Sequence, residues 1–269
     1  MTRCWPATLR KYLAVLRLET QYSMRYRLNS LFYLSALVVP VVIQYFLWTT
    51  VYRSRAQVGD YSLSAMLTYY VVAVFLSQMR LVAWWDISES IKNGTVVHYL
   101  VRPWNHFWLY FTRTLAWTFP ILLLLLPGYL ILVFVLRHRL LPPASAGALA
   151  ALILIWLAGG LFVYTLEYMT NLLAFWTERT RGFLWLLSFL TSFLSGALVP
   201  LNLLPGHRWL VLQPLAALGY LPARVYLGQV SPAEFWKTLG ILGLWLLALV
   251  PLAHLQLRRG LRRYQPPGG

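Results

Sequence analysis

Residues 84–108 read WWDISESIKNGTVVHYLVRPWNHFW, a polar stretch between two apolar runs that are each long enough to cross a bilayer. Two of the seven carboxylates in the chain, Asp86 and Glu89, fall within it, together with Lys92 and Arg102. A protein that only packs in lipid needs no more than a short polar turn at such a point. The stretch therefore indicates a structured surface to which another molecule can dock.

The composition sets the fold class. The 269-residue chain is 59% hydrophobic and only 11% charged, whereas a soluble domain carries about 25% charged residues. About 20 apolar residues in a helix cross the hydrocarbon core of a bilayer, and strands of a membrane barrel would alternate apolar and polar residues, which these runs do not. We expect an all-α polytopic membrane protein.

Six apolar runs are long enough to be transmembrane helices. The third is expected to be kinked or interrupted near Pro120 and Pro127. The expected spans cover residues 31–52, 63–85, about 115–136, 146–176, 183–204 and 238–257. They belong to one domain, 1–269, with a coupling connection at 86–114, an outer segment at 205–237 and a tail at 258–269.

The basic residues predict the orientation. With both termini in the cytoplasm of a bacterial cell, most of the 23 Lys and Arg residues flank the inner ends of the spans, although Arg137 and Arg139 fall on the outer side. The net charge of +16 then faces anionic lipid headgroups, so we expect no nucleic-acid partner. The first thirty residues have scattered charges instead of an apolar centre, which predicts no cleavable signal peptide.

Residues 1–30 are expected to form a basic amphipathic helix at the inner membrane surface. Trp5, Leu9, Tyr12 and Leu16 recur at helical spacing, and basic residues follow on another face. This helix is either a simple membrane anchor or an elbow that transmits movement to the first span.

Within the polar stretch, Ile87, Ile91 and Val96 predict one buried face of a short helix. Asn93-Gly94 is a turn signal, and Arg102-Pro103 favours an extended geometry before the next membrane entry. An ordinary solvated loop is the alternative.

Two segments resemble a known family. The pattern DISESIKNGTVVHYLVRPWN at 86–105 is similar to the cytoplasmic connection in permease subunits of bacterial ABC type-2 exporters. The pattern AFWTERTRGFLWLLSFLTSFLSGALVPLNLLP at 174–205 resembles the region around the fifth span of the same family, in Phe175-Trp176, Ser195-Gly196, Pro200 and Pro205. The resemblance covers most of the chain in order and implies the type-2 ABC exporter permease fold.

The resemblance also implies partners. Such permeases pair into dimers, with an identical or related second permease, and separate cytoplasmic ATPase subunits bind ATP and Mg²⁺ and drive them. The residues that match the coupling connection of the family are Asp86, Glu89, Ile91, Lys92, Asn93, Gly94, Arg102 and Pro103. Ser195, Gly196, Pro200 and Pro205 match the outer cap, where the family has short re-entrant helices. The pathway is implied to lie between the two permeases, along spans one, two and five.

The chain carries no G-x-x-x-x-G-K-[ST] phosphate loop, so we expect it to bind no ATP and no other cofactor itself. Its five histidines show no metal-ligand spacing, and the G-x-S-x-G signature is absent around Ser195, so we expect no metal and no catalytic residue. An intramembrane enzyme remains the weakest alternative.

Four polar residues are expected inside spans: Glu167, Gln44, Gln78 and Arg80, the last of which is expected to snorkel inward from the second span. Glu167 is the most costly of them to place in the membrane, because a carboxylate is poorly solvated in hydrocarbon. Such a group therefore faces protein or water. It either hydrogen-bonds Tyr164, Thr170 or a neighbouring helix, or carries protons in a proton-coupled transporter. Gln44 and Gln78 are expected to form hydrogen bonds between helices.

Overall fold

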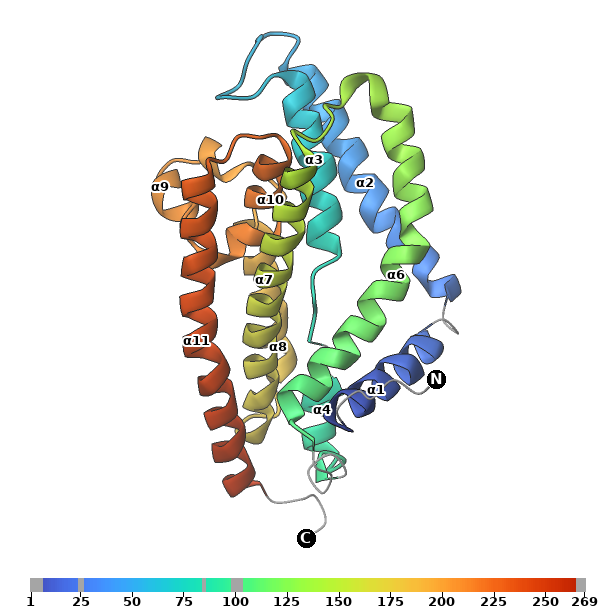
Figure 1. The fold of residues 1–269 in the computed structure, drawn as a ribbon, viewed down its shortest axis with the longest axis vertical. Coiled ribbons are helices and arrows are strands. Elements are labelled where there is room, and N and C mark those ends of the chain that lie inside the picture. Colours follow the sequence, from blue (N-terminus) through green and yellow to red (C-terminus); the bar gives the residue numbers. More distant parts are fainter. Residues whose placement is uncertain (1–6, 24–26, 84–85, 98–103, 265–269) are drawn as a thin grey trace.

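The computed structural model describes residues 7–23, 27–83, 86–97 and 104–264, and most of these residues are helical (Figure 1). The longer helices are α1 (Ala7–Ser23), α2 (Arg27–Val51), α3 (Leu63–Gln78), α6 (His106–Leu136), α7 (Ala146–Leu172), α8 (Thr180–Leu194) and α11 (Pro232–Arg263). The shorter helices are α4 (Asp86–Lys92), α9 (His207–Leu210) and α10 (Tyr220–Tyr226), and the 3₁₀ turns are η2 (Arg137–Arg139), η3 (Leu173–Phe175), η4 (Leu201–Leu203) and η5 (Pro214–Leu218).

Three helices of the described chain are long and apolar enough to cross a membrane, namely His106–Arg139, Ala146–Phe175 and Pro232–Arg263. Shorter apolar helices cover Leu37–Val51, Leu63–Gln78 and Thr180–Leu194. The molecule is therefore an all-α membrane protein, as the composition predicts.

Polar side chains set where these helices begin. Ser231 accepts a hydrogen bond from the Glu234 N–H at 3.2 Å, and Pro232 occupies the first turn of α11. Asn105 and Ser145 cap α6 and α7 in the same way. Each cap pairs a backbone N–H that the helix itself leaves free.

Several helix ends differ from the expected spans. The helix of the second span, α3, ends at Gln78, and Arg80–Ala83 are not helical. Similarly, α8 ends at Leu194, ten residues before the expected end of the fifth span. Of the two outcomes expected for the third span, the structure has the kink and not the interruption, because α6 continues through both of its internal prolines and bends (Figure 1).

Helix α7 forms the centre of the fold. It packs against α8, α10, η5 and α11. In its most apolar stretch of 18 residues, 39% of the residues are buried, whereas the corresponding values are 6% for α6 and 11% for α11. Gly159 and Gly160 permit this packing, because a Cβ on Gly159 would lie 2.9 Å from the Ala217 Cβ and one on Gly160 would lie 3.0 Å from Leu81. The Gly-Gly pair marks close approach, as expected for membrane helices.

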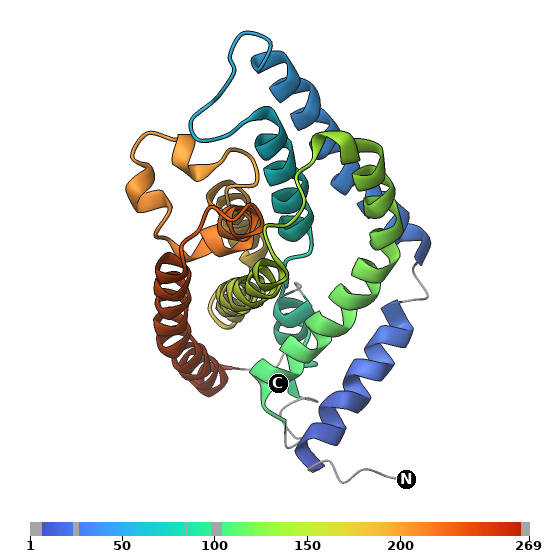
Figure 2. The same cartoon turned by 45° about the horizontal axis from the view of Figure 1, so that its top comes forward.

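The molecule has two ends. In Figures 1 and 2, α1 runs beside the first half of α6, and Figure 1 places α4 and the C-terminal end of α11 at its lower end. We call this the α4 end. The opposite end holds the loop after α2, η2, α9 and α10 (Figure 1).

Short helices fill the fold near this opposite end. Residues 215–223, in η5 and α10, are almost all buried and pack against α3 and α7. The Tyr220 N–H donates to the Ser195 carbonyl at 2.7 Å, which ties α10 to the end of α8. The prediction of helices too short to cross a bilayer is confirmed for these segments.

Candidate functional site

The non-helical segment Arg80–Ala83 lies against α6 and α7, and side chains from both helices pair its backbone. The Ala83 N–H donates to Glu167 Oε2 at 2.7 Å, and the Ala83 carbonyl accepts from Asn171 Nδ2 at 3.1 Å. Thr114 Oγ1 donates to the Val82 carbonyl at 3.1 Å. Where a helix stops inside an apolar protein, its freed backbone groups need such partners.

Glu167 is buried, with 3% of its surface exposed, and sits close to the α4 end of α7. It is five residues from Leu172, which is about 7.5 Å at 1.5 Å per residue. The expected partners Tyr164 and Thr170 are wrong, since both hydroxyls donate to other carbonyl groups. Sequence proximity suggested these partners, whereas the actual partner, Ala83, is 84 residues away.

Arg80 joins this site to α8. Its Nη2 donates to Ser188 Oγ at 2.6 Å and lies 4.0 Å from Glu167 Oε1. Arg80 therefore links the segment after α3 to α7 and α8, while 17% of its side chain stays exposed.

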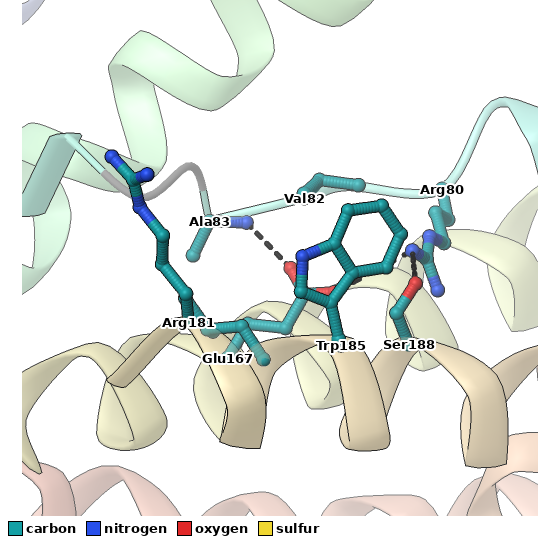
Figure 3. Close-up of a pocket in the computed structure, with 8 residues that line it drawn as sticks. Arg80, Val82, Ala83, Glu167, Arg181, Trp185 and Ser188 are labelled. Atoms are coloured by element: carbon teal, nitrogen blue, oxygen red, sulfur yellow. Dashed lines mark hydrogen bonds and ion pairs between the residues drawn. The ribbon is translucent and has the colours of Figure 1, made fainter. Parts of the chain in front are cut away.

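A cavity of about 350 Å³ surrounds these groups (Figure 3). Arg80 and Glu167 form its polar wall, and Arg181, Trp185 and Ser188 of α8 form the facing wall. The cavity thus combines two guanidinium groups, one carboxylate, a hydroxyl and an indole ring.

A second cavity, of about 320 Å³, shares Arg80 and Ser188 with the first. It continues between α2, α3 and α8 and is lined by the amides of Gln44 and Gln78. Gln44 also donates to the Leu198 carbonyl at 3.3 Å, in the non-helical chain after α8, and not to a neighbouring helix as expected. Serine, threonine and apolar side chains make up the rest of its lining.

The apolar face predicted for the polar stretch is confirmed. Ile87, Ile91 and Val96 are at most 2% exposed and pack with the aromatic residues of α6 and α7. Gly94 has a φ of +79°, which the predicted turn requires. Among the coupling candidates, Ile91 is therefore an anchor of α4 and cannot itself face a partner.

The two acidic candidates of α4 make internal ion pairs. Asp86 lies 3.1 Å from Arg113 of α6, and Arg113 also lies 3.0 Å from Glu19 of α1. Burial raises the pKa of Asp86, and the nearby Arg113 offsets part of this effect. Glu89 lies 3.1 Å from Arg181 of α8. Both carboxylates thus connect α4 to the membrane helices.

The surface that α4 leaves open is made by other candidates. Asn93 is exposed, and Lys92 and Gly94 are partly exposed. Arg102 and Pro103 lie outside the described residues. Beside Lys92, a groove of about 560 Å³ runs over Phe175, Glu178 and Arg263 to Tyr264, whose hydroxyl donates to the Ile91 carbonyl at 3.1 Å.

The cap candidates lie in the chain that follows α8. The Gly196 carbonyl accepts from the Tyr69 hydroxyl at 2.6 Å, and Gly196 has a φ of +79°. A Cβ there would lie 2.8 Å from Tyr220, so only glycine fits this turn without rearrangement. Pro200 directly precedes η4, and Pro205 follows η4 in a turn.

Sequence reasoning missed Asn171, Ser188, Thr114 and Arg181. Asn171 had a usable signal, because it follows Glu167 by four residues and therefore lies on the same face of α7. Ser188 and Thr114 carried no such signal, since single hydroxyl groups are common in apolar helices. In the described part of the chain, no group of three or more His, Cys, Asp or Glu residues is placed to hold a metal ion.

Comparison with known proteins supplies one match. Residues 38–268 match the family described as ABC-2 family transporter protein, which covers most of the chain, including α3, α4 and the cavities beside Arg80. A search of curated proteins found no match.

Proposed function

We propose that this chain, which belongs to the ABC-2 family of transporter proteins, is the permease of an ATP-driven exporter that works as a dimer with separate cytoplasmic ATPase subunits. The family establishes a membrane component of a transporter. The export direction, the dimer and the ATPase partner are our inference.

The proposed topology has six spans with both termini in the cytoplasm. The apolar helices α2, α3, α6, α7, α8 and α11 would be the spans, although α3 and α8 are short for a bilayer. The α4 end would then face the cytoplasm, and η5 and α10 would enter the membrane from the outer side. The basic residues near α4 and at the end of α11 support this orientation.

The single observation that carries the proposal is the attachment of α4. This short helix is anchored by Ile87 and Ile91, and polar contacts connect it to three membrane helices, α6, α7 and α8. A solvated loop would not need these contacts. A force applied to α4 therefore reaches α8 and the cavities beside Arg80.

The proposed ATPase contact is the open side of α4, with Lys92 and Asn93, and the groove that runs from Lys92 to Tyr264. This assignment narrows the coupling candidates. Asp86, Glu89 and Ile91 would hold α4 in place, whereas Lys92, Asn93 and Gly94 would meet the partner. ATP and Mg²⁺ would bind to the ATPase subunits, and their hydrolysis would supply the energy.

The geometry does not favour a proton-coupled transporter that uses Glu167. One carboxylate oxygen accepts the Ala83 N–H and the other lies near Arg80, so both have partners within the fold. This arrangement supports a structural role for Glu167.

Purification tests the proposal. The tagged chain is extracted from its native membrane in a mild detergent, and the co-purifying proteins are identified by mass spectrometry. We expect an ATP-binding subunit, ATP hydrolysis by the complex and none by the chain alone. Robust hydrolysis by the isolated chain, or reproducible purification without any ATPase, would contradict the proposal.

A further inference from the structure

We propose that the two cavities beside Arg80 form one binding site for an amphipathic anion, whose phosphate or carboxylate head binds Arg80 and whose apolar tail lies along α8. The site itself follows from the geometry below. That its ligand is the transported substrate rests on the proposed function.

The two cavities are continuous at Arg80 and Ser188, which line both of them. Together they run from Arg181, near the α4 end of α8, to Leu198 beyond its other end. A ligand that fills both would contact α8 along most of its length, as well as α2 and the segment after α3. Figure 3 shows Arg80 and Ser188 meeting at one side of the first cavity, with Trp185 beside them.

Two buried polar atoms in these walls have no hydrogen-bond partner among the described residues, Arg80 Nη1 and Thr191 Oγ1. Thr191 is only 1% exposed, and it lines the second cavity. Buried donors without partners are rare in folded proteins, because each loses its hydrogen bonds to water. A ligand oxygen within the cavity would pair with them.

The chemistry of Arg80 favours an anion. A guanidinium group has five N–H donors and no acceptor, and it binds phosphate and carboxylate groups through paired hydrogen bonds. Its carboxylate neighbour, Glu167, lies 4.0 Å from Nη2 and accepts the Ala83 N–H with its other oxygen. Glu167 therefore leaves Nη1 available for a second anionic group.

The opposite face of the site is apolar. Trp185 lines the first cavity and is 73% exposed, and Phe189, one turn further along α8, is 65% exposed. Exposed rings next to a partly buried cation suit a molecule with an anionic head and a hydrocarbon tail. An anion without a tail could bind Arg80 but would make no contact with the rings of Trp185 and Phe189.

The test compares three probes on the full chain, without ATPase, in nanodiscs of neutral lipid, by calorimetry with empty nanodiscs as background. Hexyl phosphate has both head and tail, hexylphosphocholine has a zwitterionic head, and inorganic phosphate has no tail. We expect hexyl phosphate to bind at least about tenfold more tightly than either of the others. Hexylphosphocholine has a neutralised head, and a charge-assisted hydrogen bond contributes about 1.5–3 kcal/mol; inorganic phosphate lacks the tail, and each buried CH₂ contributes about 0.8 kcal/mol.

Variants locate the binding. The double change Arg80→Gln with Glu167→Gln removes both charges and leaves no unpaired carboxylate, and it should weaken hexyl phosphate binding by about tenfold or more. Ser188→Ala and Thr191→Val keep the Arg80–Glu167 pair and should each weaken hexyl phosphate binding several-fold. They provide the test if the double variant does not fold. Arg179→Gln removes an exposed cation two residues from Arg181 and should change nothing.

Equal affinity for hexyl phosphate and hexylphosphocholine would overturn the anion preference, and equal affinity for inorganic phosphate would overturn the role of the tail. Unchanged binding in the Ser188 and Thr191 variants would place the ligand elsewhere. Because the measurement uses the chain alone, a negative result leaves the ATPase association standing, and loss of the ATPase association leaves the binding site standing.

Discussion

Substitution of Glu167 separates a structural carboxylate from a proton carrier. The side chain is 3% exposed and accepts the Ala83 N–H at 2.7 Å. Glutamine has the same shape, and its amide oxygen can accept the same hydrogen bond. Alanine removes the acceptor and leaves the Ala83 N–H buried without a partner. The two substitutions therefore differ in whether the backbone of Arg80–Ala83 stays paired.

The expected magnitudes follow from these contacts. Glu167→Gln loses only the attraction to Arg80 across 4.0 Å, next to a side chain that is 17% exposed, and should cost less than about 1 kcal/mol. Glu167→Ala loses the same attraction to Arg80 and in addition leaves the buried Ala83 N–H without a partner and removes buried side-chain atoms, which together should cost about 2–4 kcal/mol. The corresponding loss in Tm is about 5–10 °C for alanine and a few degrees or less for glutamine.

Two quantities are measured. The first is the Tm in one detergent, taken as the temperature at which half of the protein is no longer monodisperse after heating, and the second is transport by the assembled complex. Asp60→Ala and Asp60→Asn, at an exposed carboxylate of the opposite end, provide the matched controls and should leave the Tm unchanged. If Glu167→Gln abolished transport at an unchanged Tm, or if it destabilised the fold as much as alanine, the structural role argued for Glu167 would be refuted.

Three further predictions concern α4 and the packing of α7. Because burial raises the pKa of Asp86, the folded state binds its proton more tightly than the unfolded state, so stability falls as the pH rises through that raised pKa. Asp86→Asn should therefore change stability at pH 7 by less than about 1 kcal/mol, whereas Arg113→Gln, which leaves two carboxylates without their cation, should lower the Tm clearly. Gly159→Ala should destabilise the fold by about 1–3 kcal/mol, since the new Cβ meets Ala217. The control Gly240→Ala, with no atom within 4 Å of its Cβ, should leave the Tm equal or higher. Equal losses of Tm in the two variants would contradict the close approach of Gly159 to Ala217. A cysteine at Asn93 in a cysteine-free chain should cross-link to the ATPase subunit, and absence of any cross-link in an active complex would place the contact elsewhere.

The sequence predicts the membrane class because that class depends on composition and on the length of apolar runs, and it predicts the buried face of α4 because that face depends on local periodicity. Ile87 and Ile91 are one helical turn apart, and burial follows from that spacing alone. The end of α3 was not predictable in this way. Residues 80–83 are mostly apolar and continue the run of the second span. The helix stops because Glu167 and Asn171 pair the backbone of Ala83, and that contact exists only in the folded molecule.

The same limit explains the coupling candidates. The resemblance selected Asp86 and Glu89 as charged groups in a polar connection between two apolar runs. Charged residues in such a connection are normally expected to be exposed. Their cations, Arg113 and Arg181, are 27 and 92 residues away in sequence, and only the fold brings them together. Carboxylates that have internal partners position α4, and the residues around Asn93 are the ones that α4 leaves exposed.

The contacts of α4 differ in strength, and this difference defines how it would move. Ala83 is held by the buried Glu167 and Asn171, and the Ser88 N–H donates to the same Asn171 side chain at 3.3 Å. The Glu89–Arg181 pair is mostly exposed on the arginine side, at 66%, and such surface pairs contribute about 0–1 kcal/mol. A push on α4 would therefore break the pair with Arg181 before it broke the buried contacts. Arg181 lines the first cavity, so release of this pair would free a cation at its edge while Arg80 stayed in place. We infer that release of the Glu89–Arg181 pair changes the charge at the edge of the Arg80 site.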